Sequence, residues 1–261
     1  MVMFEVEPHR LKRIFESALP IKTLELCPIM FTPLNAQINY VSPSGNLIIL
    51  AIFSESYFKE FECEEVEYLV VYPQLLKSLR FYPRWWTECV AFWTDSRFVY
   101  TEGEEYDDKV SIPLEQVKDE MKSSPFQAII TDEGLMPTLN GEVLPINVHA
   151  LVAVEKLVRF LPKAKNKDDN EIVLVWDGET FSMVLATGSE VRTRHLSPKQ
   201  YSVKGEPIVA YFKRSDFLGV AKKFYGEVWL GLGNFGIVIS QVSYEYNLTY
   251  VLRAEKVEME E

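Results

Sequence analysis

The sequence predicts an α+β protein built from antiparallel sheets, and two observations carry that prediction. Most of the 261 residues fall into short apolar and aromatic segments separated by turn-rich links, which is typical of antiparallel strands. Four segments instead have apolar residues at steps of three and four, the spacing of an amphipathic helix. Many short strands with two helices in each half indicate sheets that carry their helices on one face.

The four helical segments form two matched pairs. His9–Leu19 and Asn147–Leu161 each run into a Leu-Pro pair, while Pro73–Tyr82 and Lys213–Tyr225 each end in Phe-Tyr. Proline stops a helix because it has no N–H to donate and disfavours helical geometry in the residue before it. The pairs therefore predict similar helices at corresponding places in two halves of the chain.

The spacing between paired helix ends indicates an internal duplication. Pro20 and Pro162 are 142 positions apart, and Tyr82 and Tyr225 are 143 positions apart. Equal offsets combined with equal amphipathic character are typical of a repeated unit. The chain is therefore predicted to comprise a first domain, a connector with proline at both ends and a second domain, at residues 1–112, 113–125 and 126–261.

The remaining apolar segments are predicted to be strands. In the first half these are Met3–Glu7, Thr23–Phe31, Ala36–Val41, Leu47–Ser54, Tyr57–Cys63, Glu67–Val71, Glu88–Trp93, Arg97–Thr101 and Lys109–Leu114. In the second half they are Phe126–Thr131, Glu142–Ile146, Glu171–Trp176, Thr180–Ala186, Glu190–Leu196, Pro207–Phe212, Glu227–Gly231, Gly236–Gln241 and Asn247–Leu252. The passage Asp132–Gly141 is predicted to be turn-rich.

Composition excludes several classes of protein. A hydrophobic content of 48% is far above that of a disordered chain. No apolar run approaches the roughly 20 residues that span a membrane. The N-terminal residues lack a signal-peptide apolar region, so we expect an intracellular protein, in the nucleus of a eukaryote or in the cytoplasm or nucleoid of an archaeon or virus. The three cysteines lack metal-site spacing, and no cofactor is predicted.

Charge is segregated between the helical segments and the rest of the chain. The whole chain has a formal net charge of −11, which by itself argues against a nucleic-acid partner. The four helical segments, however, hold eleven basic and three acidic residues, a net of +8, and the remainder has a net of −19. One basic helix face is usually just solvated. Four in an acidic protein favour contact with phosphates, without reading of bases.

Motifs of catalysis and cofactor binding do not fit their required context. Gly231–Gly236 matches the dinucleotide pattern GxGxxG, but a predicted strand follows it where the pyrophosphate would need a helix N-terminus. We therefore interpret it as a hairpin turn. His9, His149 and His195 lack neighbouring ligands for a metal. No catalytic residue or metal site is predicted, although an enzyme built from scattered residues stays open.

Several stretches together resemble the PCNA family of DNA sliding clamps (proliferating cell nuclear antigen). They are Met3–Glu5, Leu11–Arg13, Pro73–Arg80, Phe217–Lys223 and, the most specific, Leu248–Glu258. The resemblance covers nearly the whole chain, which would be a divergent member. It implies a DNA-clamp fold in which two similar domains per subunit, each with antiparallel sheets and two helices, place the helices inside a ring.

The resemblance also implies a function. A clamp of this family is a processivity factor without catalytic activity: it encircles double-stranded DNA without sequence preference and tethers proteins of DNA replication and repair. Its expected partners are DNA polymerase, the clamp loader and other proteins with a short peptide motif. No membrane partner and no cofactor are implied. The ring would be trimeric, as a homo-oligomer or hetero-oligomer.

Site residues carry over from the family by position. The residues expected to bind DNA are Arg10, Lys12, Arg13, Lys77, Arg80, Lys156, Arg159, Arg214, Lys222 and Lys223. The residues expected to bind partner peptides come from an early loop, the connector and the tail, and are Ser42, Gly45, Leu47, Leu114, Val117, Leu252, Ala254 and Val257. For the connector and tail, the alternative is ordinary interdomain packing and a frayed end.

Two departures from the family pattern leave other functions open. The tail reads Arg253-Ala254-Glu255 where the family usually has Ala-Pro, and the passage Phe126–Gly141 is longer than expected between connector and third helix. One alternative is a checkpoint-type clamp or a subunit of a hetero-oligomeric ring. Another, from a different class, is a Mg-dependent nucleic-acid-processing enzyme whose acids hold metal beside the basic helices.

Overall fold

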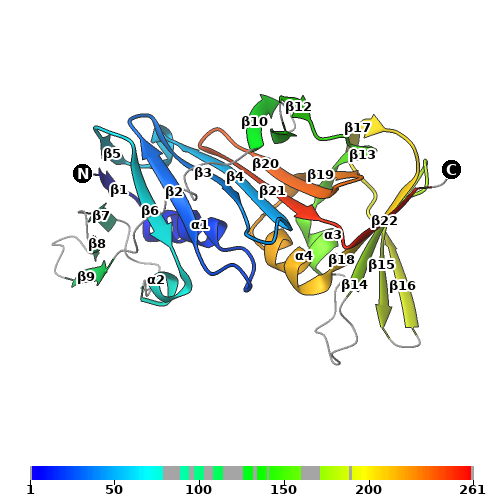
Figure 1. Cartoon of the computed structure of the whole chain (residues 1–261), viewed down its shortest axis with the longest axis horizontal. Helices are drawn as coiled ribbons and strands as arrows, with labels where there is room; N and C mark the ends of the chain where they lie inside the picture. The colour runs from blue at the N-terminus through cyan, green and yellow to red at the C-terminus, as the bar shows by residue number, and fades with distance from the viewer. Residues whose placement is uncertain are drawn as a thin grey trace. The chain divides into compact units, whose positions relative to one another are not determined.

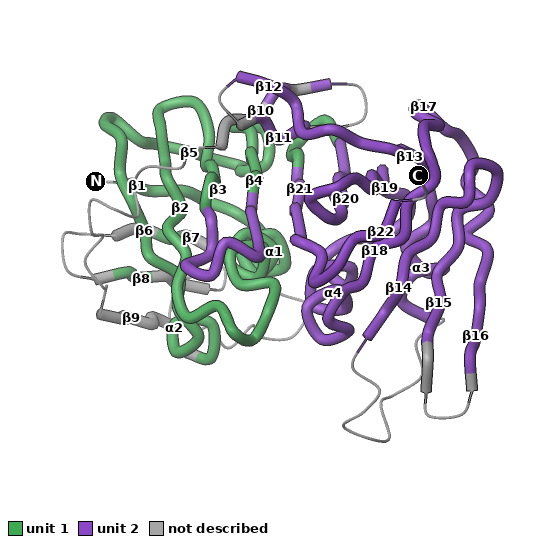
Figure 2. The backbone as a smooth tube through the Cα atoms, turned by 45° about the vertical axis from the view of Figure 1, so that its right-hand side comes forward, with its two compact units in different colours: residues 1–40, 50–124, 243–247 green, residues 41–49, 125–242, 248–261 purple. Residues whose placement is uncertain are grey.

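Two compact units make up the chain in the computed structural model (Figure 2). The structure describes residues 2–78, 89–93, 97–102, 108–113, 126–131, 134–139, 141–159, 171–187 and 190–259. Unit 1 comprises residues 1–40, 50–124 and 243–247, and unit 2 comprises residues 41–49, 125–242 and 248–261. Two short segments, 41–49 and 243–247, thus belong to the unit opposite to the one that surrounds them in sequence.

Unit 1 combines antiparallel sheets with the helices labelled α1 and α2 in Figure 1. One sheet has the order β5-β1-β7-β8-β9, formed by Glu60–Cys63, Val2–Glu5, Cys89–Trp93, Arg97–Glu102 and Asp108–Pro113. The other strands follow the order β4-β3-β2-β6, formed by Leu47–Ser54, Asn35–Val41, Cys27–Thr32 and Glu67–Val71, with Leu50 onward of β4 in this unit. The helical elements are α1 (Pro8–Ala18), α2 (Pro73–Ser78) and the 3₁₀ turn η1 (Glu55–Tyr57).

Helix α1 follows its sequence pattern closely. Pro8 occupies the first turn, where its missing N–H costs nothing, and Pro20 follows the C-cap Leu19. The apolar stripe is buried, and its Phe15 ring meets Phe98 of β8 edge-on at 5.5 Å between centroids. Burial of one such ring contributes roughly 1.5–3 kcal/mol to the free energy of unfolding. The opposite side of α1 presents its basic residues.

Unit 2 repeats the plan with more strands. One run has the order β17-β13-β19-β20-β21, formed by Gln200–Lys204, Val148–Ala153, Glu227–Gly233, Gly236–Val242 and Tyr246–Arg253, of which residues 246–247 belong to unit 1. A second sheet has the order β16-β15-β14-β18-β22, formed by Glu190–His195, Phe181–Thr187, Glu171–Trp176, Ile208–Lys213 and Lys256–Met259. A three-stranded sheet has the order β10-β11-β12, formed by Phe126–Thr131, Gly134–Leu139 and Glu142–Val143.

Helices α3 (Val154–Val158) and α4 (Arg214–Ala221) complete unit 2 and contact each other. Each follows a strand directly, α3 after β13 and α4 after β18, as α1 follows β1 and α2 follows β6 in unit 1. The core holds fully buried aromatic side chains, including Trp176, whose Nε1 donates to the Gly205 carbonyl at 2.9 Å. The antiparallel sheets with few helices confirm the α+β prediction.

The predicted helix Asn147–Leu161 is wrong in its first half. Val148–Ala153 forms strand β13, which pairs with both β17 and β19, and α3 begins only at Val154. Val148, His149 and Ala150 are all buried. A strand buried on both faces gives a continuous apolar run, and such a run cannot be told from a helix by periodicity alone. Here the pairing of β13 with a strand on each side determines that the segment is a strand and not a helix.

Three further elements differ from the sequence-based expectation. The passage predicted to be turn-rich, Asp132–Gly141, contains strand β11, which pairs with β10. The unexpectedly long passage Phe126–Gly141 therefore belongs to a small sheet. Strands β17 and β22 were not predicted, and β22 shows that the tail pairs with β18 instead of fraying. The hairpin interpretation of Gly231–Gly236 is confirmed, since β20 follows β19 with Gly233 opposite Gly236.

Candidate nucleic-acid interface and partner surface

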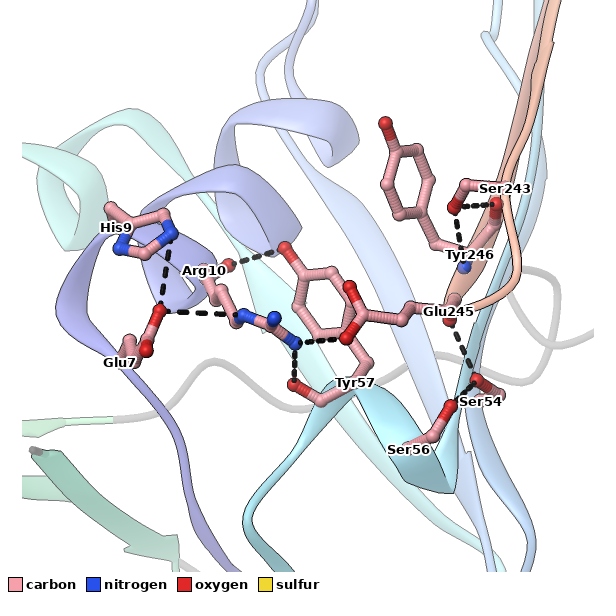
Figure 3. Close-up of polar contacts among 9 residues, drawn as sticks. All are labelled: Glu7, His9, Arg10, Ser54, Ser56, Tyr57, Ser243, Glu245 and Tyr246. Atoms are coloured by element: carbon pink, nitrogen blue, oxygen red, sulfur yellow. Dashed lines mark hydrogen bonds and ion pairs between the residues drawn. The ribbon is translucent and has the colours of Figure 1, made fainter.

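Arg10 on α1 is held by a network of contacts within unit 1 (Figure 3). Its Nη1 donates to the Tyr57 carbonyl and to Glu245 Oε1, both at 2.9 Å, and Nε lies 3.4 Å from Glu7. The guanidinium also lies over the Tyr57 ring, 5.1 Å from its centroid. Burial raises the pKa of the Tyr57 hydroxyl well above its ordinary value, although Arg13 and Arg10 oppose the shift. Arg10 is therefore engaged by acids and an aromatic ring.

Arg13, one turn further along α1, contacts the same segment. Its Nη2 donates to the Tyr246 hydroxyl at 2.5 Å, and its guanidinium lies 4.2 Å from the centroid of the Tyr246 ring. The Tyr246 ring stacks on Phe53 and meets the Tyr57 ring edge-on. A guanidinium at this distance from a ring gains about 0.5–2 kcal/mol. The segment Ser243–Asn247 is thus tied to α1 through both arginines.

The other predicted cations of unit 1 are more accessible. Lys12 is exposed on α1, with Nζ 3.7 Å from Glu16 one turn on. An exposed pair of this kind is weak and is easily exchanged for another anion. Lys77 is exposed in the last turn of α2. Arg80 lies outside the described residues.

Unit 2 places its predicted cations differently. Arg159 is exposed at the C-terminal end of α3, and Lys156 is half-buried with Nζ donating to the Ser197 carbonyl at 3.0 Å. Arg214 begins α4 and is 4% exposed, so little of its side chain is accessible to a phosphate. Its DNA-binding role stays a prediction that its burial does not favour. Lys222 is exposed just past α4, and Lys223 is half-buried.

The described cations available to an anion are therefore fewer than the sequence pattern indicated. Lys12, Lys77, Arg159 and Lys222 are exposed, whereas Arg10 and Arg13 bind residues of unit 1 and Arg214 is buried. The sequence could not reveal this difference because Glu245, which pairs with Arg10, and Tyr246, which binds Arg13, lie more than 230 positions away. No helix among the described residues has the length and apolarity that a membrane span requires. In the described ranges, His, Cys, Asp and Glu side chains form no cluster of three that could hold a metal ion.

The predicted partner surface begins at the loop between β3 and β4. Ser42 is buried, and its Oγ donates to Asn46 Oδ1 at 2.7 Å while accepting from the Leu47 amide at 3.1 Å. Gly45 has a positive φ of 67°, a conformation that favours glycine. Leu47 is fully buried, so its side chain packs in the core and is not exposed on the surface of the loop.

The tail after β21 meets this loop within unit 2. The Arg253 amide donates to the Asn46 carbonyl at 2.9 Å, the Ala254 amide to Phe235 at 3.2 Å, and the Glu255 amide to Tyr211 at 2.8 Å. Three successive residues thus bind three different elements. Leu252 is buried, while Ala254 and Val257 are half-buried. The structure therefore joins the β3–β4 loop to the start of the tail, while Val257 pairs separately with Ala210 of β18. Leu114 and Val117 lie outside the described residues.

Contacts that sequence reasoning missed complete this surface. Asn46, Phe235 and Tyr211 accept the tail amides through their carbonyls, which no side-chain pattern reveals. Gly236 is required beside them, because a Cβ there would lie 2.2 Å from the Leu252 carbonyl oxygen and its φ is 135°. The positive φ and the close backbone approach are the reasons for glycine at this end of the GxGxxG pattern.

A small ionic cluster fixes β22 against β18. The Tyr211 hydroxyl donates to Glu258 Oε2 at 3.1 Å, and Lys256 pairs with Glu258 Oε1. The hydrogen bonds from Lys256 and Tyr211 lower the pKa of the Glu258 carboxyl, and the same carboxylate raises the pKa of the Lys256 ammonium. All three groups are exposed enough to exchange with solvent ions. The cluster therefore orients β22 against β18 and adds little to the free energy of unfolding.

Comparison with known proteins identifies the fold. No protein-family model and no curated protein sequence matches the chain. Solved structures do match: PCNA of A. fulgidus with the C-terminal region of FEN-1 bound aligns at TM-score 0.75 and 12% identity, covering 100% of both chains.

Two other structures agree with this match. PCNA of Entamoeba histolytica aligns at TM-score 0.75 and 13% identity, covering 98% of this chain and 99% of that one. A PCNA2–PCNA3 complex of Sulfolobus tokodaii aligns at TM-score 0.72 and 11% identity, covering 97% and 99%. Over essentially its whole length, this chain therefore has the PCNA-like clamp fold.

Proposed function

We propose that the protein is a DNA sliding clamp, without catalytic activity, that encircles duplex DNA as a closed trimeric ring and tethers replication and repair proteins. The observation that carries the proposal is the match of fold to PCNA over the full length of both chains. A match over the full length of both chains favours the same kind of assembly.

The distribution of charge supports a weak, sliding contact with DNA. Exposed cations lie on or beside helices in both units, namely Lys12, Lys77, Arg159 and Lys222. The chain as a whole has a formal net charge of −11, which opposes tight nonspecific binding. A few phosphate contacts per subunit give an attraction that falls steeply with salt and carries no sequence preference. Retention then has to come from topology.

Two open sheet edges support a ring. In the described part of the chain, β9 pairs only with β8, and β16 pairs only with β15. Because β9 belongs to unit 1 and β16 to unit 2, pairing β9 of one copy with β16 of the next makes a head-to-tail contact. Head-to-tail contacts generate closed rings when the rotation closes.

The tail surface supports recognition of partner peptides. In the A. fulgidus structure the bound partner is the C-terminal region of FEN-1. We propose that the β3–β4 loop and the tail residues Ala254 and Val257 bind such segments here. Both elements are held rigidly by backbone hydrogen bonds, which reduces the entropy lost on binding.

Solution mass tests the ring. Light scattering should give about three times the 30.2 kDa of one chain. Val191→Asp, which puts an acid at a residue of β16 that is 71% exposed, should lower the mass toward that of a monomer. Leu34→Asp changes a residue of equal exposure, 72%, in the β2–β3 turn and should leave the trimer intact. A wild-type monomer at all concentrations would refute the homotrimer.

A further inference from the structure

Two links of unit 1 leave its strands at the same end, at the upper left of Figure 1. β2 pairs with β6 until Phe31 lies opposite Glu67, and the turn into β3 follows one residue later. The β2–β3 turn and the link from β5 to β6, residues 64–66, are therefore neighbours. The second link is held in place by the Cys63 thiol, which donates to the Glu65 carbonyl at 2.9 Å.

Both links expose large apolar side chains. Leu34 in the β2–β3 turn is 72% exposed, and Val66, just before β6, is 55% exposed. Met30 and Tyr68 lie opposite each other on β2 and β6 and are half-buried, and the Tyr68 hydroxyl donates to the Met30 sulfur at 3.3 Å. Val66 precedes Tyr68 by two residues, the spacing that places side chains on one side of a strand. We call these four residues the Leu34–Val66 surface, since clustered exposed apolar residues with an adaptable methionine mark interaction sites.

The charges beside this surface all have one sign. Glu64 and Glu65 are exposed and directly precede Val66. Residues 60–72 contain five glutamates and neither Lys nor Arg, and residues 27–41 contain no charged side chain. In the part of the chain that the structure describes, acids, His and Cys do not gather into a cluster of three suited to a metal ion. The Leu34–Val66 surface therefore combines exposed apolar side chains with negative charge that no metal site explains.

This combination selects one kind of occupant. Glutamates repel the phosphates of DNA and the headgroups of anionic lipids, and a second copy of the chain would bring the same glutamates against each other. A segment in which Lys or Arg stands next to apolar residues is complementary to both features of the surface. We propose that the Leu34–Val66 surface binds a partner protein through such a basic amphipathic segment. Its apolar residues contact the surface itself, and its Lys or Arg residues meet Glu64 and Glu65.

The Leu34–Val66 surface is separate from the sites already described. Ala254 and Val257 of the tail belong to unit 2, whereas this surface belongs to unit 1. β5, which leads into the link, lies at the opposite edge of its sheet from β9, the strand proposed to contact the next copy. The proposal therefore depends on neither the ring, nor DNA, nor the tail.

A basic amphipathic peptide tests the proposal on the full-length protein. The probe is a short, fluorescein-labelled peptide in which pairs of leucine alternate with pairs of lysine, and its binding is followed by anisotropy. We expect saturable binding that weakens as salt rises, together with slower hydrogen exchange of the amides of residues 64–70. The same peptide with serine in place of leucine, or with glutamate in place of lysine, should bind about tenfold more weakly or not at all.

Paired apolar variants localise the site. Leu34→Ser combined with Val66→Ser removes both exposed apolar contacts and should weaken peptide binding about tenfold. Val143→Ser combined with Val242→Ser changes two other valines, 47% and 42% exposed, and should alter binding by less than about twofold. Wild-type amide exchange locates the peptide independently, so the result does not depend on the folding of a variant.

Paired acidic variants separate local charge from the charge of the whole chain. Glu64→Gln with Glu65→Gln should weaken peptide binding at low salt about tenfold. Glu179→Gln with Glu206→Gln removes the same charge from two exposed positions of unit 2 and should weaken it by less than about twofold.

Several outcomes would overturn the proposal. The leucine–lysine peptide does not bind, it binds without slowing exchange in residues 64–70, or a control pair weakens binding as much as the pair that it controls. The proposal is also overturned if wild-type protein, but not the variant with Leu34→Ser and Val66→Ser, forms dimers of its assembly or binds vesicles of phosphatidylcholine and phosphatidylserine. A second copy or a membrane would then occupy the surface.

Discussion

Helix α1 and the segment 213–225, which contains α4, are both basic in sequence but place their arginines in different surroundings. On α1, Arg10 and Arg13 reach sideways to Glu245 and Tyr246 and remain partly accessible. On α4, Arg214 is buried at the first residue of the helix, close in sequence to the buried Asp216. Basic residues on helices therefore do not all have the same role. The cations divide into those that hold a unit together and those that are available to an external anion.

Removing the buried arginine of α4 should have the largest effect. Arg214→Ala deletes a buried side chain together with its polar contacts, so we expect the free energy of unfolding to fall by about 2–4 kcal/mol. Lys222→Ala, at the exposed end of the same helix, should change it by less than about 0.5 kcal/mol. Urea unfolding of both variants measures the difference. Equal stabilities would show that Arg214 does not support α4.

Removing an arginine of α1 should cost less. Arg13→Ala loses one hydrogen bond and the ring contact with Tyr246, a loss of about 1–2 kcal/mol. Lys12→Ala, on the exposed side of the helix, is the matched control and should stay within about 0.5 kcal/mol. The claim that Arg13 supports the unit and Lys12 does not would be wrong if Lys12→Ala destabilised the protein as much as Arg13→Ala in the same urea titration.

The same division should appear in DNA binding. Each of Lys12→Ala, Lys77→Ala, Arg159→Ala and Lys222→Ala should reduce the slope of log K against log salt by about one unit per subunit. Arg10→Ala should leave the slope nearly unchanged, because Glu245 and Glu7 already neutralise that guanidinium. Duplex binding measured at several salt concentrations gives the slopes. A reduction for Arg10→Ala equal to that for Lys12→Ala would place Arg10 among the phosphate contacts instead.

The smallest effect is expected for the surface ion pair between Lys256 and Glu258 in the tail. The pKa of Glu258 is lowered by its bonds from Lys256 and Tyr211. A carboxyl with a lowered folded-state pKa contributes stability above its unfolded pKa, about 4.3, and loses it as the pH falls further through the folded value. The midpoint of the pH-dependent change in the NMR shifts of β22 amides should therefore lie below about pH 4.3. In Glu258→Gln this titration should disappear, and its persistence would exclude the cluster as its source.

Sequence reasoning predicted the fold class and most strands because local pattern determines them. Leu47–Ser54 and Glu171–Trp176, for example, coincide with β4 and β14 at both ends. It failed at β13, where pairing on both sides overrides a helix-like spacing, and at β11, where the turn residues Gly134 and Pro137 obscure a strand.

The candidate sites were less predictable than the fold. Basic residues can be counted in a sequence, but their exposure depends on distant partners such as Glu245 and on burial such as that of Arg214. The partner-binding role of the tail remains a prediction, and the hydrogen bonds that hold the tail, from Arg253, Ala254 and Glu255, end on backbone carbonyls. Carbonyl acceptors leave no trace in residue identity, and only the folded chain reveals them.

The most direct test of the clamp proposal is retention on linear duplex DNA whose ends can be closed. The protein is incubated with a duplex carrying biotin at both ends, streptavidin is added to block the ends, and the complex is washed at high salt, which removes contacts that depend on charge. The proposal predicts that protein stays on the blocked duplex and is released when a restriction enzyme cuts it. Release from blocked and cut DNA at the same rate would contradict topological linkage, and with it the sliding clamp.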